Sequence, residues 1–313
     1  MARVAVTGGT GFVGANLVRR LLGDGHEVHL LVRPGHQRWR LDDVAGDLRW
    51  RAIDLAHRDE LATLVRVLEP EQVFHLAAHG AYSWQTDHGE IFATNVVATD
   101  HLLAACRAAG VPTLVHAGSS SEYGAVDHAP SEGEAVRPNS YYALTKAWAT
   151  LAVQHAGYTA VRLYSVYGPW EDPRRLVPTL VEHGLEGRLP PLADPSTARD
   201  FVHVDDVVEA LVRAAAAPPP PGGEPGPIYN IGTGTQTTLR EAVEEARRLL
   251  GVEAEPRWAT LAPRGWDTDV WVADPSLARE RLGWRATIAF GEGLAAVAAW
   301  QREQMARSEG GPR

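Results

Sequence analysis

The chain has 313 residues, 45% of them hydrophobic, which is enough for two domains or one large domain with a substantial core. Its 30 basic and 39 acidic residues give a net charge of −9, which argues against nucleic acid or an anionic membrane as the main partner. A single cysteine, Cys106, excludes an internal disulfide and a thiolate metal site, and we expect no metal.

The first 22 residues combine a strand, a glycine-rich turn and an amphipathic helix. Val4 and Val6 belong to a short β-branched run of the kind that forms buried parallel strands. In the turn that follows, Gly8 permits a tight bend, Gly11 lets a phosphate approach the backbone, and Gly14 lets the helix lie close to the sheet. The apolar side of the helix contains Phe12, Val13, Leu17, Val18, Leu21 and Leu22. Since the helix amides point to the turn, we predict a dinucleotide site there; an ordinary glycine-rich turn is the alternative.

The second predicted strand, Glu27 to Val32, bears on the choice of cofactor. In NAD sites an acidic residue at the end of this strand binds the ribose 2′-hydroxyl, whereas an arginine suits a 2′-phosphate. Arg33 occupies that place, and Arg38 and Arg40 follow shortly after. The pattern favours NADP(H). NAD remains open, because a solvated surface arginine would give the same pattern.

Strands and helices alternate up to about residue 165. The further strands are predicted at Leu48 to Ile53, Val73 to Ala78, Thr113 to Ala117 and Ala160 to Tyr164, with long helices at Ile91 to Ala109 and Ser140 to Gln154. This alternation is typical of an α/β fold with a doubly wound parallel sheet (Rossmann), so we expect residues 1–165 to form a dinucleotide-binding domain.

The composition changes after residue 165, where prolines and aromatic residues become frequent. The stretch 218–227 predicts a surface loop, and Leu239 to Leu250 and Phe290 to Arg302 predict helices. We expect residues 166–313 to form mainly a smaller C-terminal substrate-binding lobe over the carboxyl ends of the strands, with some segments returning to the sheet. No apolar run approaches the ~20 residues of a membrane span, and the N-terminus enters a strand directly, so we expect a cytoplasmic protein.

Hydroxyl and amine side chains follow the fifth predicted strand. Ser119, Ser120 and Ser121 stand at its end, and Tyr142 and Lys146 are four residues apart on the next helix, with the ammonium near the phenol. A free tyrosine, with a pKa near ~10, is a poor base, but an ammonium and a cationic nicotinamide bring it into working range. A serine hydroxyl would hold the substrate oxygen. Together with the glycine turn, this pattern predicts hydride transfer to or from a nicotinamide.

Motifs along nearly the whole chain resemble one family. They are Gly8-x-x-Gly11-x-x-Gly14, the serine-rich strand end closing in Tyr123-Gly124, Tyr142-x-x-x-Lys146, the segment 161–169 and the segment 199–206. Together they are similar to the extended short-chain dehydrogenase/reductases of the NAD(P)-dependent nucleotide-sugar epimerase/dehydratase type. The motifs are specific for the superfamily and not for one substrate.

The resemblance implies roles for residues near the cofactor. Ser119 takes the place of the catalytic hydroxyl residue, with Ser120 as its competitor, beside Tyr142 and Lys146, which also contact the dinucleotide. Residues next to the adenine, phosphates and ribose are implied to be Asp54, Leu55, Ala77 and Ala78.

The resemblance also implies a substrate site for a nucleotide sugar. Its residues would be Ser120, Glu122, Tyr164, Arg199 and Arg264. The two arginines correspond to the family's pyrophosphate contacts, and a forked guanidinium suits phosphate oxygens, although a surface salt bridge would explain either one.

The residues after Ser119 bear on the reaction. Sugar dehydratases of the family carry an Asp-Glu pair there, but this chain has Ser120 and Ser121, which disfavours dehydration unless a shifted loop brings in Glu122. The Glu122-Tyr123-Gly124 segment resembles relatives that reduce 4-keto-6-deoxy sugars. We therefore predict an NADPH-dependent 4-ketoreductase of an NDP-4-keto-(6-deoxy)hexose. The alternatives are a nucleotide-sugar 4-epimerase with tightly bound NAD and a catalytically silent NADP-binding regulator.

The two long helices also suggest a homodimer, because in relatives such helices pair across a two-fold axis. Their apolar residues include Val96, Val97, Leu102, Leu103, Ala147, Trp148, Leu151 and Val153. The same faces would serve equally for packing inside one subunit.

Overall fold

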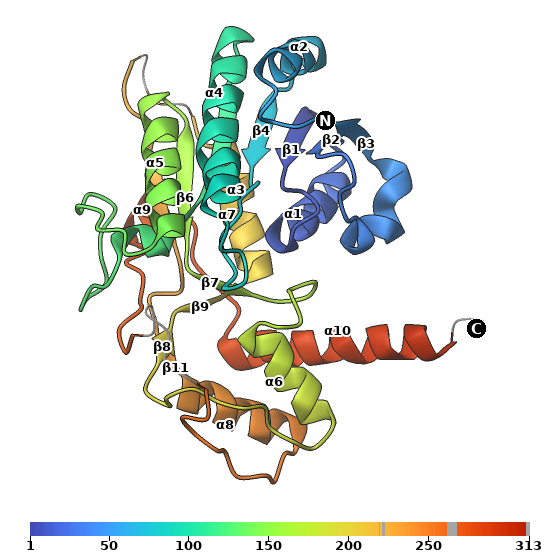
Figure 1. Ribbon diagram of the computed structural model, residues 1–313, viewed down its shortest axis with the longest axis vertical. Helices are drawn as coiled ribbons and strands as arrows, with labels where there is room; N and C mark the ends of the chain where they lie inside the picture. The colour runs from blue at the N-terminus through green and yellow to red at the C-terminus, as the bar shows by residue number, and fades with distance from the viewer. Residues whose placement is uncertain (219, 221–222, 262–267, 311–313) are drawn as a thin grey trace.

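A parallel sheet of seven strands forms the centre of the structure, a computed structural model (Figure 1). It describes residues 1–313 except 219, 221–222, 262–267 and 311–313. The strand order is β10-β6-β5-β4-β1-β2-β3, and every neighbouring pair is parallel. The strands are β1 (Arg3–Thr7), β2 (Glu27–Val32), β3 (Arg49–Ala52), β4 (Gln72–His75), β5 (Thr113–Ser119), β6 (Thr159–Leu163) and β10 (Ile228–Ile231). The chain runs outward from β1 in both directions, which confirms the doubly wound fold and leaves a crevice between β1 and β4.

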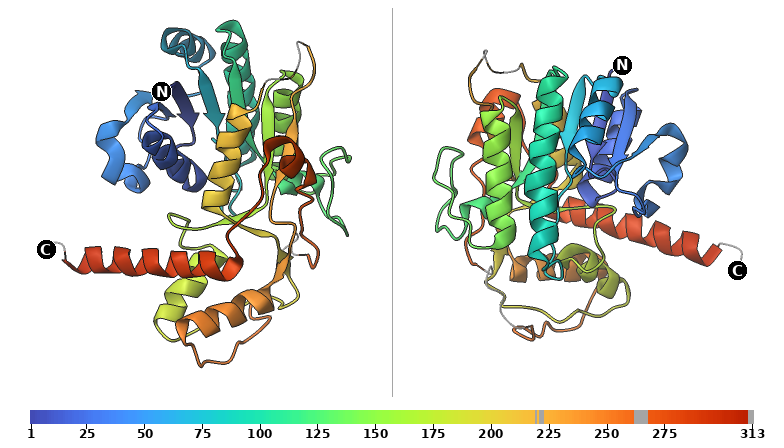
Figure 2. Two further views of the ribbon diagram at one scale, coloured as in Figure 1. Left: turned by 180° about the vertical axis from the view of Figure 1, so that it is seen from behind. Right: turned by 45° about the horizontal axis from the view of Figure 1, so that its top comes forward.

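Helices cover both faces of the sheet, because successive strand residues point to opposite sides. Val4 and Val6 belong to one core, which also holds α1 (Phe12–Gly23), α7 (Val204–Ala216) and α9 (Ser276–Leu282). Ala5 belongs to the opposite core, beneath α2 (Arg58–Leu68), α4 (Ala98–Ala108) and α5 (Tyr141–His155). The two views of Figure 2 show these layers, with α1 and α7 in front on the left and α4 and α5 in front on the right.

The long helix predicted at Ile91 to Ala109 is interrupted. It consists of α3 (His88–Phe92), the π-helical turn η2 (Ala93–Val97) and α4. The π turn carries the buried Asn95, whose amide donates to the His79 carbonyl (2.8 Å) and to Thr145 Oγ1 (3.0 Å), while its oxygen accepts from the His79 amide (2.8 Å). Asn95 therefore ties the loop after β4 to α5, and π turns often occur at functional sites.

Three helices and two small sheets form a lobe at the carboxyl ends of the strands (Figure 1). The helices are α6 (Leu176–Leu185), α8 (Leu239–Leu250) and α10 (Phe290–Gly310). The strands are β7 (Ser165–Tyr167) with β9 (Phe201–His203), and β8 (Ala198–Arg199) with β11 (Thr237–Thr238). Leu180, Val243 and Leu294 bring the three helices into one apolar core. Within the described part of the chain, every helix is too short or too polar to span a lipid bilayer.

Two 3-10 segments complete the description, η1 (Trp39–Asp47) after β2 and η3 (Ser120–Tyr123) after β5. The strand predicted to run to Ala78 ends at His75, because the backbone beyond it packs against the glycine turn: a Cβ on Gly8 would lie 2.4 Å from the Leu76 carbonyl carbon.

Candidate active site

The glycine turn between β1 and α1 is shaped to receive an anion. Gly8 has a φ of +69°, and a Cβ on Gly14 would lie 2.2 Å from the Gly8 carbonyl oxygen, so both positions require glycine. Gly11 is the N-cap of α1 and leaves the first amides, at Phe12 and Val13, without a side-chain cap. Free amides at a helix N-terminus, over a turn without side chains, fit the pyrophosphate of a dinucleotide.

The predicted adenosine contacts lie at the ends of the neighbouring strands. Arg33 follows β2 directly and is exposed, whereas the equally exposed Arg38 lies 3.7 Å from the carboxylate of Asp42. The side chain of Arg40 makes its contacts within the protein. Its Nε donates to the Trp170 carbonyl (2.7 Å), and its guanidinium stacks on Trp39, 4.3 Å from the ring centre. Of the three arginines, Arg33 is the one that directly follows β2.

Small and acidic residues continue this edge of the sheet. Asp54 lies two residues beyond β3, where its Oδ1 accepts from the Ala56 amide (2.9 Å), and Leu55 beside it is buried. In the loop after β4, Ala77 is half-buried and Ala78 is exposed. The four residues therefore lie at the carboxyl edge where the glycine turn also lies.

Tyr142 and Ser119 meet at the end of β5. Ser140 caps α5 by accepting from the Ala143 amide (3.1 Å), which places Tyr142 in the first turn of the helix, and the phenol hydrogen-bonds with the Ser119 hydroxyl. Burial raises the pKa of Tyr142 to about 12, although the bond to Ser119 lowers it. Gly80, with a φ of +93°, passes over the ring, since a Cβ there would lie 3.3 Å from Tyr142 Cδ2.

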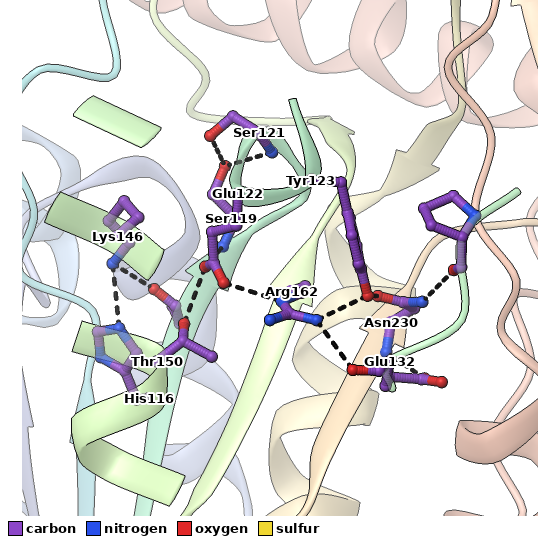
Figure 3. Close-up of polar contacts among 12 residues, drawn as sticks. His116, Ser119, Ser121, Glu122, Tyr123, Glu132, Lys146, Thr150, Arg162 and Asn230 are labelled. Carbon is purple, nitrogen blue, oxygen red and sulfur yellow. Dashed lines mark hydrogen bonds and ion pairs between the residues drawn. The ribbon is translucent and has the colours of Figure 1, made fainter. Parts of the chain in front are cut away.

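Lys146, the only lysine of the chain, lies one turn further along α5 and is 1% exposed. Its ammonium donates to the Ala117 carbonyl (2.6 Å) and lies 3.2 Å from His116 Nε2 (Figure 3). Burial lowers its pKa to about 8, while the charge of Glu122 raises it. The ammonium thus binds to β5. The sequence predicts that Lys146 lowers the pKa of Tyr142, but in this structure the pKa of Tyr142 is raised.

Glu122 points into the protein and is completely buried. Its Oε1 accepts from the Ser119 amide (2.7 Å) and from Thr150 Oγ1 (2.8 Å), and its Oε2 accepts from Arg162 Nε (2.8 Å), as Figure 3 shows. Neither carboxylate oxygen is exposed, and a contact of Glu122 with the substrate stays a prediction. In this structure Glu122 fixes the backbone of Ser119.

Two of the remaining predicted substrate residues, Ser120 and Tyr164, adjoin one small cavity. Ser120 and Tyr164 are buried and line a small cavity together with Trp271, and the Tyr164 hydroxyl has no hydrogen-bond partner among the described residues. The guanidinium of Arg199, on β8, lies 5.3 Å from the ring centre of Trp271. Arg264 lies outside the described residues.

Sequence reasoning missed a charged group beside Tyr142. Arg175 and Tyr82 are close enough for their charges to act on the pKa of Tyr142, and the charge of Arg175 also lowers the pKa of Tyr82. The carboxylate of Glu171 is buried, its Oε1 lies 3.5 Å from Arg175 Nε, and its Oε2 has no hydrogen-bond partner among the described residues. Burial raises the pKa of Glu171 to about 8. Glu171 and Arg175 are four residues apart, but no spacing in the sequence links this pair to Tyr142.

Comparisons with known proteins agree with this geometry. The NAD dependent epimerase/dehydratase family matches residues 4–232. A UDP-glucose 4-epimerase of Mycolicibacterium smegmatis is 35% identical, over 94% of this chain and 96% of that protein. A dTDP-6-deoxy-L-talose 4-dehydrogenase (NAD(P)(+)) of Kitasatospora kifunensis is 33% identical, over 90% of each.

A solved structure of MoeE5 in complex with UDP-glucose and NAD superposes on the chain with a TM-score of 0.83 and 33% identity, covering 96% of this chain and 99% of that one. The likeness therefore includes the C-terminal lobe as well as the sheet. A glycine cradle, a Tyr-x-x-x-Lys helix and relatives that span nine-tenths of the sequence lead to one conclusion. The chain is an enzyme of the short-chain dehydrogenase/reductase type and belongs to the NAD dependent epimerase/dehydratase family.

Proposed function

We propose that the protein transfers a hydride at C4 of a nucleotide sugar, as an NADPH-dependent 4-ketoreductase of an NDP-4-keto-(6-deoxy)hexose. The observation that carries the choice of reaction is the inward orientation of Glu122, which leaves Ser119, Ser120 and Ser121 at the end of β5 without a free carboxylate. Removal of a C5 proton needs such a base, whereas reduction of a ketone needs only a proton donor.

In this proposal the chain holds a carbonyl oxygen and supplies a proton. Ser119 and Tyr142 both direct hydroxyls to one place, so they can bind the C4 oxygen together. Tyr142 is protonated at neutral pH and gives its proton to that oxygen as the bond to hydrogen forms. The bound dinucleotide supplies the hydride. Lys146 carries a positive charge next to the ribose position, and this charge attracts the anionic dinucleotide.

A 4-epimerase is the second candidate, and the relatives favour it. The M. smegmatis relative is named as an epimerase, and MoeE5 is bound to NAD and not to NADP. An epimerase would use the same Ser119, Tyr142 and Lys146 but would retain its dinucleotide through each cycle.

One experiment separates these functions. The dinucleotide released on denaturing the purified protein is identified, and NADPH consumption is then followed with a panel of 4-keto sugar nucleotides. Net consumption supports the ketoreductase, whereas bound NAD with interconversion of C4 epimers and no net consumption supports the epimerase. A protein that binds NADPH but fails in both assays, and whose Tyr142→Phe variant behaves identically, would be the silent regulator.

The preference for NADPH is expected to depend on Arg33. We expect Arg33→Asp to raise the KM for NADPH by about 10- to 100-fold and to leave that for NADH unchanged or lower, because the variant loses one 2′-phosphate contact and gains a repulsive charge. Initial rates with both dinucleotides measure this. Arg66→Asp, the same change on the exposed face of α2, is the control. Equal effects on both dinucleotides would contradict the assignment of Arg33.

We also propose a homodimer, with a revised contact face. Leu102, Leu103, Ala147 and Val153 are buried inside the subunit, so they are not available to a partner. Large apolar side chains that remain exposed on α3 and α5 are Phe92 (45%), Leu144 (54%), Trp148 (39%) and Leu151 (46%). Burying such a patch favours association.

This face makes a prediction for Trp148→Glu. A charge at its centre should convert the dimer to a monomer, since an unpaired charge is costly in an apolar interface. Light scattering after size exclusion should then give 33.9 kDa in place of twice that mass. Val67→Glu, on the exposed side of α2, should leave the dimer intact. A wild-type protein that is monomeric at micromolar concentration would contradict the proposal.

A further inference from the structure

Two buried histidines lie side by side beneath α5, the helix that carries Tyr142 and Lys146. The parallel register pairs His75 on β4 with His116 on β5, so both side chains point to the same face of the sheet. Each is 1% exposed, and their rings are 5.1 Å apart between centres. Lys146 reaches this pair from α5, and its Nζ lies 3.2 Å from His116 Nε2.

The hydrogen bonds around His75 assign its protons. Thr99 uses its one hydroxyl proton to bond the Asn95 carbonyl (2.7 Å), so its oxygen must accept from His75 Nε2–H (2.8 Å). His75 Nδ1 then accepts from the Thr7 hydroxyl (2.7 Å). Both ring nitrogens are used in the neutral form, and burial and the charge of Lys146 lower the pKa of His75 to about 3. His75 is therefore a fixed, uncharged neighbour of His116.

The side-chain contact of His116 is with Lys146, and the backbone of His75 also acts on the pKa of the His116 ring. Its Nε2 faces the Lys146 ammonium, whereas Nδ1 is buried without a hydrogen-bond partner in the described part of the chain. An ammonium has only protons to offer, so Nε2 must be the acceptor and the ring must be neutral, with its proton on Nδ1. The loss of a bond at Nδ1 is a cost that the fold tolerates, which suggests that the contact at Nε2 has a use.

We propose that His116 is a positioning residue for Lys146: its Nε2 accepts a hydrogen bond that keeps the ammonium charged and fixed at the end of β5, facing the dinucleotide site. Without it, the Ala117 carbonyl would be the remaining hydrogen-bond acceptor of the ammonium among the described residues. The other titratable groups near Lys146 are the neutral His75 and the carboxylate of Glu122, which favours the charged amine. The inference goes beyond the proposed function, because it does not depend on the sugar or on the direction of hydride transfer.

The single lysine allows a direct test. In protein produced with lysine labelled with ¹³C at Cε, the side chain gives one Cε resonance, whose shift with pH reports the ionisation of Lys146. In the full-length protein stripped of dinucleotide, the midpoint is expected at about 8. His116→Leu should lower it by about one pH unit, since a hydrogen bond to a charged group is lost. His116→Gln, whose Oε1 can replace Nε2, should restore most of that difference.

Two further variants keep the test decisive. His116→Asn retains polarity but is too short to reach Nζ, so it should lower the midpoint even if the leucine variant does not fold. His29→Leu, a buried histidine on β2 beside Glu27, should leave the midpoint unchanged. Circular dichroism confirms folding of each variant. A midpoint in folded His116→Leu or His116→Asn equal to that of the wild type would overturn the inference, as would a fall of equal size in the glutamine variant.

Discussion

Tyr142→Phe is expected to lower the rate of hydride transfer by about 10²- to 10⁴-fold while the protein folds and retains its dinucleotide. The substitution removes one oxygen atom, and the ring keeps its contact with the loop at Gly80. What is lost is the proton donor and half of the hydroxyl pair that binds the substrate oxygen. Single-turnover consumption of NADPH, measured with the responsive 4-keto sugar nucleotide, gives the rate.

The adjacent residue provides a matched control. Tyr141 begins α5 and stacks on His88 at 4.1 Å between ring centres, so Tyr141→Phe makes the same chemical change one position away. Its rate should remain within about two-fold of the wild type, because the Tyr141 hydroxyl is not assigned a contact with the substrate oxygen. If Tyr142→Phe keeps more than about a tenth of the wild-type rate, the role assigned to the phenol is wrong.

The pH dependence of reduction follows from the two shifted groups. Burial raises the pKa of Tyr142 to about 12, so the phenol remains protonated, and competent as an acid, throughout the neutral range. Burial lowers the pKa of Lys146 to about 8, so the positive charge beside the dinucleotide is present below that value and disappears above it. The rate of reduction should therefore be level near pH 7 and fall above about pH 8, and the fall should follow the Cε titration of Lys146.

Local patterns explain why much of the fold could be predicted. The strand Glu27–Val32 and the helix Leu239–Leu250 have the predicted bounds. The first is a run whose last five residues are buried, before a proline turn, and the second has a Thr238–Glu241 capping box and a closing glycine. The π turn at Ala93–Val97 could not be predicted, since the apolar residues on either side keep a helical spacing. The turn carries Asn95, which contacts a loop and a helix that are remote in sequence.

In the candidate site, too, the features set by local patterns could be predicted and those set by contacts remote in sequence could not. The glycine turn, Tyr142 and Lys146 are set by spacing within one element, and sequence suffices for them. The direction of Glu122 depends on Arg162, a residue of another strand 40 positions later, so the sequence could not predict it. Likewise, the Lys146 ammonium turns to His116 because the two strands beneath it carry polar side chains at one register position.

The pair formed by Glu122 and Arg162 should dominate the stability of this region. Arg162→Leu is expected to reduce the free energy of unfolding by about 3–5 kcal/mol at pH 8, because it leaves a buried carboxylate without its charged partner. The guanidinium also donates to the Tyr123 hydroxyl (2.8 Å), which in turn donates to Asn230 (2.8 Å), so η3, β6 and β10 lose a shared link. Urea unfolding of wild-type and variant protein measures the change.

The effect of pH on the stability of Arg162→Leu distinguishes an unpaired buried charge from a simple loss of packing. In the wild type, burial raises the pKa of Glu122 while Arg162 opposes the rise. Without Arg162 the opposition is gone, and the folded variant binds a proton that the unfolded chain, with a pKa near ~4.3, releases. Stability then increases as pH falls, so the loss caused by Arg162→Leu should be smaller at pH 5 than at pH 8.

Glu122→Gln combined with Arg162→Leu should cost less than the sum of the single changes, whereas Arg248→Ala, in an exposed pair with Glu245, should cost at most about 1 kcal/mol. A loss that is the same at both pH values, with additive single changes, would mean that Arg162 acts through packing and not through its charge.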